Sequence, residues 1–75
     1  MHMNPSTIGK NLSTARNRAG ISQQELGQLT GVDQTYVSRT ELGKKKFADP
    51  EWLARAAIVL RCDIRELLLG EQESA

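Results

Sequence analysis

The stretch ISQQELGQLTGVDQTYVSRTELGKKK, residues 21–46, carries start and stop signals for two short helices. Ser22 and Glu25 have the spacing of a capping box, in which each side chain accepts a hydrogen bond from the other residue's backbone N–H. Gly31 can take the left-handed conformation that ends a helix, and Asp33 is a good N-cap for the next one. Only Gly31-Val32-Asp33 lie between the two helices. Because so short a turn makes two helices cross steeply, the stretch predicts a helix-turn-helix.

Small and apolar residues within this stretch should hold the two helices together. Gly27 falls on the inner side of the first helix, where the second must pass close, so a small residue is needed there. A glycine inside a helix costs roughly 0.5–1 kcal/mol, and its presence therefore indicates a close approach. Leu26, Val32 and Val37 are expected to supply the apolar contacts, and Gly31 the turn.

Three further helices can be read from caps and apolar spacing in the flanking sequence. The first begins near Asn4-Pro5 and ends at Gly20, and Asp49-Pro50 starts another after the lysines. The last, a short one, begins at Asp63 and ends at Gly70. Since no segment shows the strict alternation of a strand, we predict an all-α fold of five helices around one core.

The length of 75 residues suits one small domain. No linker or internal repeat divides the sequence, so residues 1–75 are expected to form a single domain, with its core at about residues 6–69 and short flexible termini. No apolar run approaches the roughly 20 residues of a membrane-spanning helix, and no signal-peptide core is present, so a cytoplasmic location is expected. Met1-His2-Met3 has the character of a cloning remnant, and His2 is given no role.

The net charge of +1 hides an uneven distribution of charge along the chain. Residues 1–46 hold seven Lys and Arg and three acidic residues, a net charge of +4. Residues 47–75 hold three Arg and six acidic residues, a net charge of −3. The basic part is suited to a polyanion and the acidic part is not.

Residues for catalysis or metal binding are missing from the sequence. Cys62 is the single cysteine and His2 the single histidine, so neither a disulfide within the chain nor a metal site can be assembled. Cys62 is expected to be a buried structural thiol. Because no Ser/His/Asp set or Gly-rich phosphate loop is present either, we expect no enzyme activity and no cofactor.

Several short motifs in the middle of the chain occur together in one known family. They are Ser22-Gln23-x-Glu25-Leu26-Gly27, Gly31-Val32, and Val37-Ser38-Arg39-x-Glu41-x-Gly43. Over about residues 6–69 the chain resembles the Cro and phage-repressor, or XRE-type, helix-turn-helix family, and residues 33–38 are most similar to the small controller proteins of restriction-modification systems. The resemblance implies a compact lambda-repressor-like DNA-binding domain in which helices 2 and 3 form the helix-turn-helix. Thr40, Leu42 and Arg61 depart from the family pattern, which often has a larger aliphatic, Asn and Gly there.

The resemblance implies that the third helix lies in the major groove of DNA. The candidate base-reading residues, on the side away from Val37 and Thr40, are Gln34, Thr35, Ser38 and Arg39. Glutamine can pair bidentately with adenine and arginine with guanine, which makes Arg39 the strongest single candidate. The alternative is an ordinary solvated polar face.

A second set of residues is expected at the DNA backbone, where contacts raise affinity without conveying sequence. Its candidates are Gln23, Tyr36, Lys44, Lys45, Lys46 and Arg16. For Gln23 the alternative is support of the helix cap, for Tyr36 packing alone, and for the lysines a solvated loop. Arg16 and Glu41 also stand where relatives form an ion pair between the first and third helices, which would orient the reading helix as a surface pair worth about 0–1 kcal/mol.

The fifth helix has more apolar residues than a short helix can bury on one side. We expect Ile64, Leu67, Leu68 and Leu69, with Trp52 and Ile58 as further candidates, to form the two-fold interface of a homodimer. The alternative is that all of these residues are monomer core.

Together these features favour a homodimeric, sequence-specific regulator of transcription that binds a pseudo-palindromic operator in double-stranded DNA. Autoregulation, as in restriction-modification controllers or phage-type repressors, fits the same reading. An antitoxin-like module that neutralises a partner protein and binds DNA secondarily is the alternative, with residues 47–75 as its interaction surface. Non-specific nucleic-acid binding is a third. No membrane or small-molecule partner is indicated.

Overall fold

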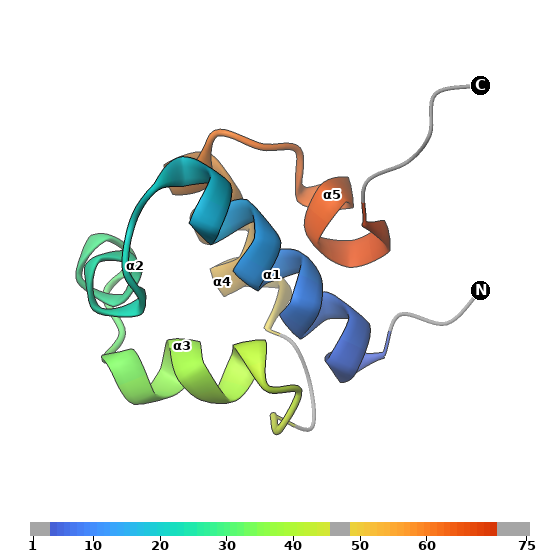
Figure 1. Cartoon of the computed structure of the whole chain (residues 1–75), viewed down its shortest axis with the longest axis horizontal. Coiled ribbons are helices and arrows are strands. Elements are labelled where there is room, and N and C mark those ends of the chain that lie inside the picture. Colours follow the sequence, from blue (N-terminus) through green and yellow to red (C-terminus); the bar gives the residue numbers. More distant parts are fainter. Residues whose placement is uncertain (1–3, 46–48, 71–75) are drawn as a thin grey trace.

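Five helices make up the computed structural model of the protein, which describes residues 4–45 and 49–70 (Figure 1). Their bounds are Pro5–Ala19 for α1, Gln23–Thr30 for α2, Gln34–Glu41 for α3, Pro50–Leu60 for α4 and Ile64–Leu69 for α5. The described residues contain no strand. The predicted all-α class and the predicted number of helices are therefore confirmed.

A polar residue caps the start of each helix, which is why the helix starts could be read from the sequence. The caps are Asn4, Ser22, Asp33, Asp49 and Asp63, and each side chain accepts a hydrogen bond from a backbone N–H of the first turn. Both halves of the capping box are present, because the backbone N–H of Glu25 donates to Ser22 Oγ at 3.0 Å and that of Ser22 to Glu25 Oε1 at 2.9 Å.

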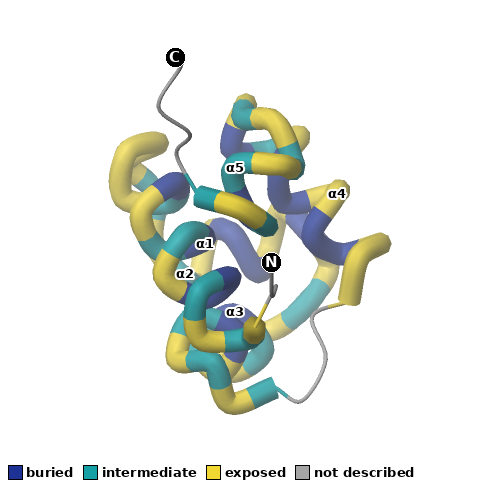
Figure 2. Tube along the Cα trace, turned by 90° about the vertical axis from the view of Figure 1, so that its right-hand side faces the viewer, coloured by how far each residue is buried: buried dark blue, intermediate teal, exposed yellow. Residues whose placement is uncertain are grey.

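The centre of the core takes one large side chain from every helix. Leu12, Leu26, Val37, Leu53 and Leu67 are each at most 1 % exposed. Figure 2 shows the buried positions gathered on the inner sides of the helices. Because all five helices meet at this cluster, each of them holds the others in place.

The helix α1 runs through the molecule and packs against α3 on one side and α5 on another (Figure 1). Its contact with α3 is very close at Gly9, where an added Cβ would lie 2.4 Å from the carbonyl oxygen of Glu41 and 2.5 Å from that of Thr40. Only a glycine fits at this position, since a side chain would push the C-terminal end of α3 away. The signal for this contact in the sequence is a glycine, Gly9, inside a helical run next to Ile8.

The structure shows the surroundings of Thr40 and Arg61, two of the residues that depart from the family pattern. Thr40 is 5 % exposed and its hydroxyl donates to the carbonyl oxygen of Tyr36 at 2.8 Å, so its polar group is satisfied inside the core. Arg61 ends α4 in the left-handed conformation, with φ 57° and ψ 45°. Within the described residues it is the only non-glycine residue with a positive φ.

None of the described helices combines the length and apolarity needed to cross a membrane.

Candidate nucleic-acid interface

The turn between α2 and α3 follows from two glycines. Gly31 ends α2 with φ 82°, a conformation that costs little only for glycine. A Cβ at Gly27 would lie 2.7 Å from the carbonyl oxygen of Val32, so the close neighbour of Gly27 is the backbone of the turn. We had expected the body of the next helix there. Leu26 and Val37 are fully buried and Val32 packs against the core, which holds α3 across the end of α2.

The helix α3 is divided into an inner and an outer side. Val37 is fully buried and Thr40 nearly so, whereas Gln34, Thr35 and Arg39 are exposed. Ser38, the remaining candidate base reader, is half-buried. The outer side of α3 thus carries amide, hydroxyl and guanidinium groups, which are the side chains that can pair with base edges.

An ion pair joins the C-terminal end of α3 to α1. The guanidinium of Arg16 binds the carboxylate of Glu41 in bidentate fashion, with Nε at 2.6 Å from Oε2 and a second nitrogen at 3.1 Å from Oε1. A third N–H group of Arg16 donates to the carbonyl oxygen of Ile21 at 2.9 Å. The two side chains are only 12 % and 6 % exposed, so our expectation of a surface ion pair is wrong. Desolvated and bidentate, the pair orients α3 more firmly than a surface pair can.

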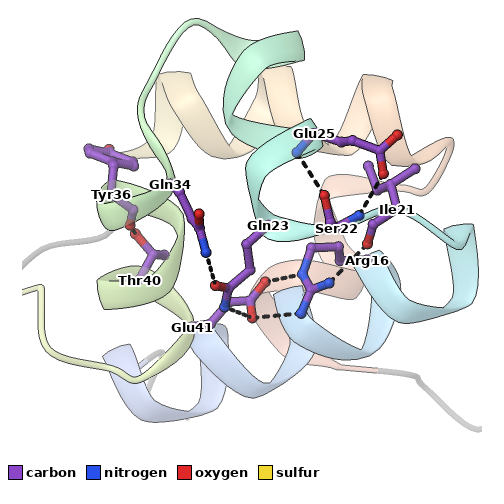
Figure 3. Close-up of polar contacts among 9 residues, drawn as sticks. All are labelled: Arg16, Ile21, Ser22, Gln23, Glu25, Gln34, Tyr36, Thr40 and Glu41. Atoms are coloured by element: carbon purple, nitrogen blue, oxygen red, sulfur yellow. Dashed lines mark hydrogen bonds and ion pairs between the residues drawn. The ribbon is translucent and has the colours of Figure 1, made fainter.

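The same carboxylate also orients a row of two glutamines (Figure 3). Gln23 Nε2 donates to Glu41 Oε1 at 3.0 Å, and Gln34 Nε2 lies 3.4 Å from Gln23 Oε1. A carboxylate paired with a guanidinium can accept hydrogen bonds but not donate them. Gln23 must therefore turn its NH₂ group toward Glu41 and its oxygen toward Gln34. Sequence reasoning missed this link, because it joins residues far apart along the chain.

The residues expected at the DNA backbone have different surroundings. Arg16 has little exposed surface for a phosphate, since its donors point to Glu41 and Ile21. Lys44 is exposed, and the ammonium of Lys45 lies over the ring of Tyr36, 4.0 Å from its centroid. Lys46 lies outside the described residues. Lys44 and Lys45 come shortly after the end of α3 at Glu41, and Lys45 contacts the ring of Tyr36 on that helix.

The residues expected at a dimer interface are not all on the surface. Leu67 is 0 % exposed and Trp52 2 %, so both belong to the core of the chain and neither can meet a partner. Ile64 and Leu68 are partly buried against the core. Ile58 and Leu69 are exposed, at 76 % and 37 %. The expected cluster is thus part core and part surface.

Small clefts lie on the side of α1 that faces α5. They measure about 160 and 180 Å³ and share Ala15, Arg18 and Glu66 in their walls. Cys62, at the edge of one of them, is half-buried, and burial raises the pKa of its thiol. In the part of the chain that the structure describes, no group of His, Cys, Asp and Glu could hold a metal ion.

Comparison with known proteins agrees with this geometry. A helix-turn-helix domain family matches residues 7–69. The restriction-modification controller protein C.AhdI from Aeromonas hydrophila is 30 % identical with a TM-score of 0.78, over 84 % of this chain and 90 % of that one. The hypothetical transcription factor NHTF from Neisseria is 31 % identical with a TM-score of 0.78, over 87 % of this chain and 74 % of that one.

A repressor solved in complex with an operator is also similar. The P22 c2 repressor in complex with a synthetic operator is 26 % identical with a TM-score of 0.76, over 85 % of this chain and 96 % of that one. The predicted resemblance, including the similarity to restriction-modification controllers, is confirmed. The chain belongs to the helix-turn-helix family of Cro and phage-repressor type and has its lambda-repressor-like fold.

Proposed function

We propose that this chain is a sequence-specific, double-stranded DNA-binding regulator of transcription that acts as a homodimer on a pseudo-palindromic operator. The observation that carries the proposal is the fixed orientation of α3. Its inner side is buried, its end is tied to α1 by the Arg16–Glu41 pair, and its polar side chains are turned outward. Membership of the helix-turn-helix family and similarity to a repressor solved with its operator support it. A cytoplasmic location is part of the same proposal.

In this proposal the outer side of α3 enters the major groove. Arg39 pairs with a guanine, and Gln34 with an adenine, while Thr35 and Ser38 contact neighbouring base edges. Because Gln23 already takes one N–H of Gln34, the amide oxygen and the second N–H of Gln34 remain for a base. The hydrogen bond to Gln23 thus orients the amide of Gln34 already in the free protein, which reduces the conformational entropy lost on DNA binding.

The contacts to phosphates come from both ends of the motif. The N-terminus of α2, which begins at Gln23, presents first-turn backbone N–H groups that have no acceptor within the helix, and these suit a phosphate oxygen. Lys44, Lys45 and Lys46 supply positive charge at the other end, where Tyr36 contacts the ammonium of Lys45. Such contacts determine how steeply DNA affinity falls as salt concentration rises. Each neutralised phosphate adds about 0.9 to the slope of the logarithm of the binding constant against the logarithm of the salt concentration.

The dimer in this proposal forms through the surface part of the apolar cluster on α5. Leu69 is its exposed member, Ile64 and Leu68 are its partly buried members, and Ile58 of α4 is a further candidate. A two-fold arrangement would place two copies of α3 about one turn of DNA apart, at roughly 34–36 Å.

The test is selection of bound sequences from a random duplex library, followed by affinity measurements on single base changes in the selected site. Arg39→Ala should remove the preference at one base pair of each half-site, by roughly 5- to 150-fold, because one bidentate contact is worth ~1–3 kcal/mol. Lys44→Ala is the matched control, since it removes an exposed cation next to α3. It should weaken binding to all duplexes alike.

Selection that returns no preferred sequence would contradict the proposal. Salt-sensitive binding of equal strength to every duplex would indicate non-specific binding. Absence of DNA binding would favour the alternative function, an antitoxin-like module that neutralises a partner protein. An equal loss on all duplexes with Arg39→Ala would show that Arg39 contacts a phosphate and does not read a base.

A further inference from the structure

Lys45, Tyr36 and Trp52 form a stack that runs from the surface into the core. Trp52 belongs to α4 and is 2 % exposed. The ring of Tyr36, on α3, meets it nearly edge-to-face, with centroids 5.1 Å apart and an angle of 65° between the planes. The ammonium of Lys45 lies 4.0 Å from the centroid of the Tyr36 ring. The stack thus joins a surface cation to the centre of the fold.

The ring of Tyr36 is held in place from below. Edge-to-face packing is the arrangement that aromatic quadrupoles favour, and a buried partner such as Trp52 cannot easily move. The indole N–H of Trp52 has no hydrogen-bond partner among the described residues. Its contribution here is consequently the shape and face of the aromatic group, which phenylalanine can partly reproduce.

Lys45 gains a defined position from this ring. The chain leaves α3 through Gly43, with φ 73°, and the backbone N–H of Lys44 donates to the carbonyl oxygen of Arg39 at 2.9 Å. The backbone ahead of Lys45 is therefore tied to the end of α3. A lysine side chain in such a loop normally samples many rotamers, and the attraction of a cation to a ring face selects among them. The ammonium has three N–H donors, so contact with the ring leaves donors for an anion.

The hydroxyl of Tyr36 has less suitable surroundings for a phosphate. The pKa of Tyr36 is raised, first because the group is partly buried and second because the carboxylate of Asp49 is close, while Arg55 acts in the opposite direction. A phosphate that approached the hydroxyl would also approach Asp49. Arg55 would offset part of the repulsion between a phosphate and Asp49, whereas the ring face carries the ammonium of Lys45, so the ring face is the better place for the DNA backbone.

We propose that Tyr36 serves DNA binding through its ring, as the platform that fixes the ammonium of Lys45 against a DNA phosphate at the end of α3. Trp52 is a positioning residue that acts through Tyr36. The inference rests on the proposed function and deepens it, because it names which lysine contacts the phosphate and what holds that lysine in place.

The experiment measures affinity for the selected operator as a function of salt concentration. Lys45→Met should lower the log–log salt slope by about 0.9 for each bound subunit. Tyr36→Leu should lower it by a similar amount and Tyr36→Phe should not, because phenylalanine keeps the ring. The salt slope of the double variant Tyr36→Leu/Lys45→Met should be no lower than the slope of Lys45→Met alone.

A second measurement uses the free protein and does not depend on DNA. The ring current of Tyr36 should shift the NMR signals of the Lys45 side-chain CH₂ group next to the ammonium upfield. This shift should persist in Tyr36→Phe and Trp52→Phe and disappear in Tyr36→Leu. If Tyr36→Leu does not fold, as judged by its thermal transition, Tyr36→Phe and Lys45→Met still test the inference.

Three results would overturn the inference. An unchanged slope in Lys45→Met would mean that Lys45 contacts no phosphate. A loss in Tyr36→Phe as large as that in Lys45→Met would assign the contact to the hydroxyl. An unshifted Lys45 signal in the wild type would mean that the ring does not hold the lysine. Failure of the wild type to prefer any duplex is a different outcome, because it overturns the proposed function itself.

Discussion

At the scale of single residues, Glu41 is the side chain that joins the proposed reading helix α3 to both α1 and α2. Its carboxylate accepts hydrogen bonds from Arg16 and from Gln23, and through Gln23 it reaches Gln34. One buried carboxylate therefore both ties α3 to α1 and orients an amide on the outer side of α3. A change at Glu41 should affect stability and sequence preference together.

Glu41→Gln should lower the free energy of unfolding by about 3 kcal/mol, because it leaves the guanidinium of Arg16 largely buried without its counter-charge. Urea denaturation followed by circular dichroism measures the change. Glu25→Gln is the matched control, since glutamine also serves at the third position of a capping box and the loss there should be below roughly 0.5 kcal/mol. Equal losses of unfolding free energy in the two variants would mean that the buried Arg16–Glu41 pair contributes no more to stability than the capping box does.

At the scale of the elements, α4 has an unusual end. Helices commonly end with a glycine in the left-handed conformation, and Arg61 takes this conformation in its place. A residue with a Cβ is strained there, and Arg61 is exposed and does not belong to the described core or to the side chains packed against it.

Arg61→Gly should therefore stabilise the protein by about 1 kcal/mol, because relief of the left-handed strain exceeds the extra entropy of glycine in the unfolded chain. For a domain of this size that corresponds to a rise in melting temperature of roughly 4–8 °C, measurable by calorimetry. Arg61→Ala removes the same charge but keeps the Cβ, so its melting temperature should stay close to that of the wild type. A similar rise in the alanine variant would assign the effect to the charge and not to the backbone.

At the scale of the whole molecule, the helix-turn-helix and α5 occupy different sides of α1 (Figure 1). The excess of positive charge lies in residues 1–46 and the excess of negative charge in residues 47–75. This separation would let one side meet DNA while the other meets a second copy of the chain, since a polyanion is attracted to one part and repelled by the other.

Leu69→Glu should weaken the proposed dimer and leave the monomer folded, because the side chain is already 37 % exposed. Sedimentation equilibrium measures the dimer dissociation constant, which should rise at least 10-fold if an apolar contact is replaced by two facing carboxylates. Ile58→Glu places the same charge on α4 and tests whether that helix takes part. If both variants sediment like the wild type, the dimer, where one forms, uses another surface.

The sequence by itself determined the features that depend on near neighbours. The capping box at Ser22, the left-handed turn at Gly31 and the outward direction of Gln34 and Arg39 follow from spacing within one or two helical turns. For that reason the five helices, the helix-turn-helix and the family could be predicted before the structure.

The tertiary structure alone decided which residues meet across the chain. Leu67 was predicted at a dimer interface and lies in the core, because α5 turns that side toward α1 and α4. The close contact at Gly9, the burial of the Arg16–Glu41 pair and the ring of Tyr36 beneath Lys45 were equally hidden. Each depends on how one helix lies against another, and helical spacing defines the side a residue occupies but not what will cover it.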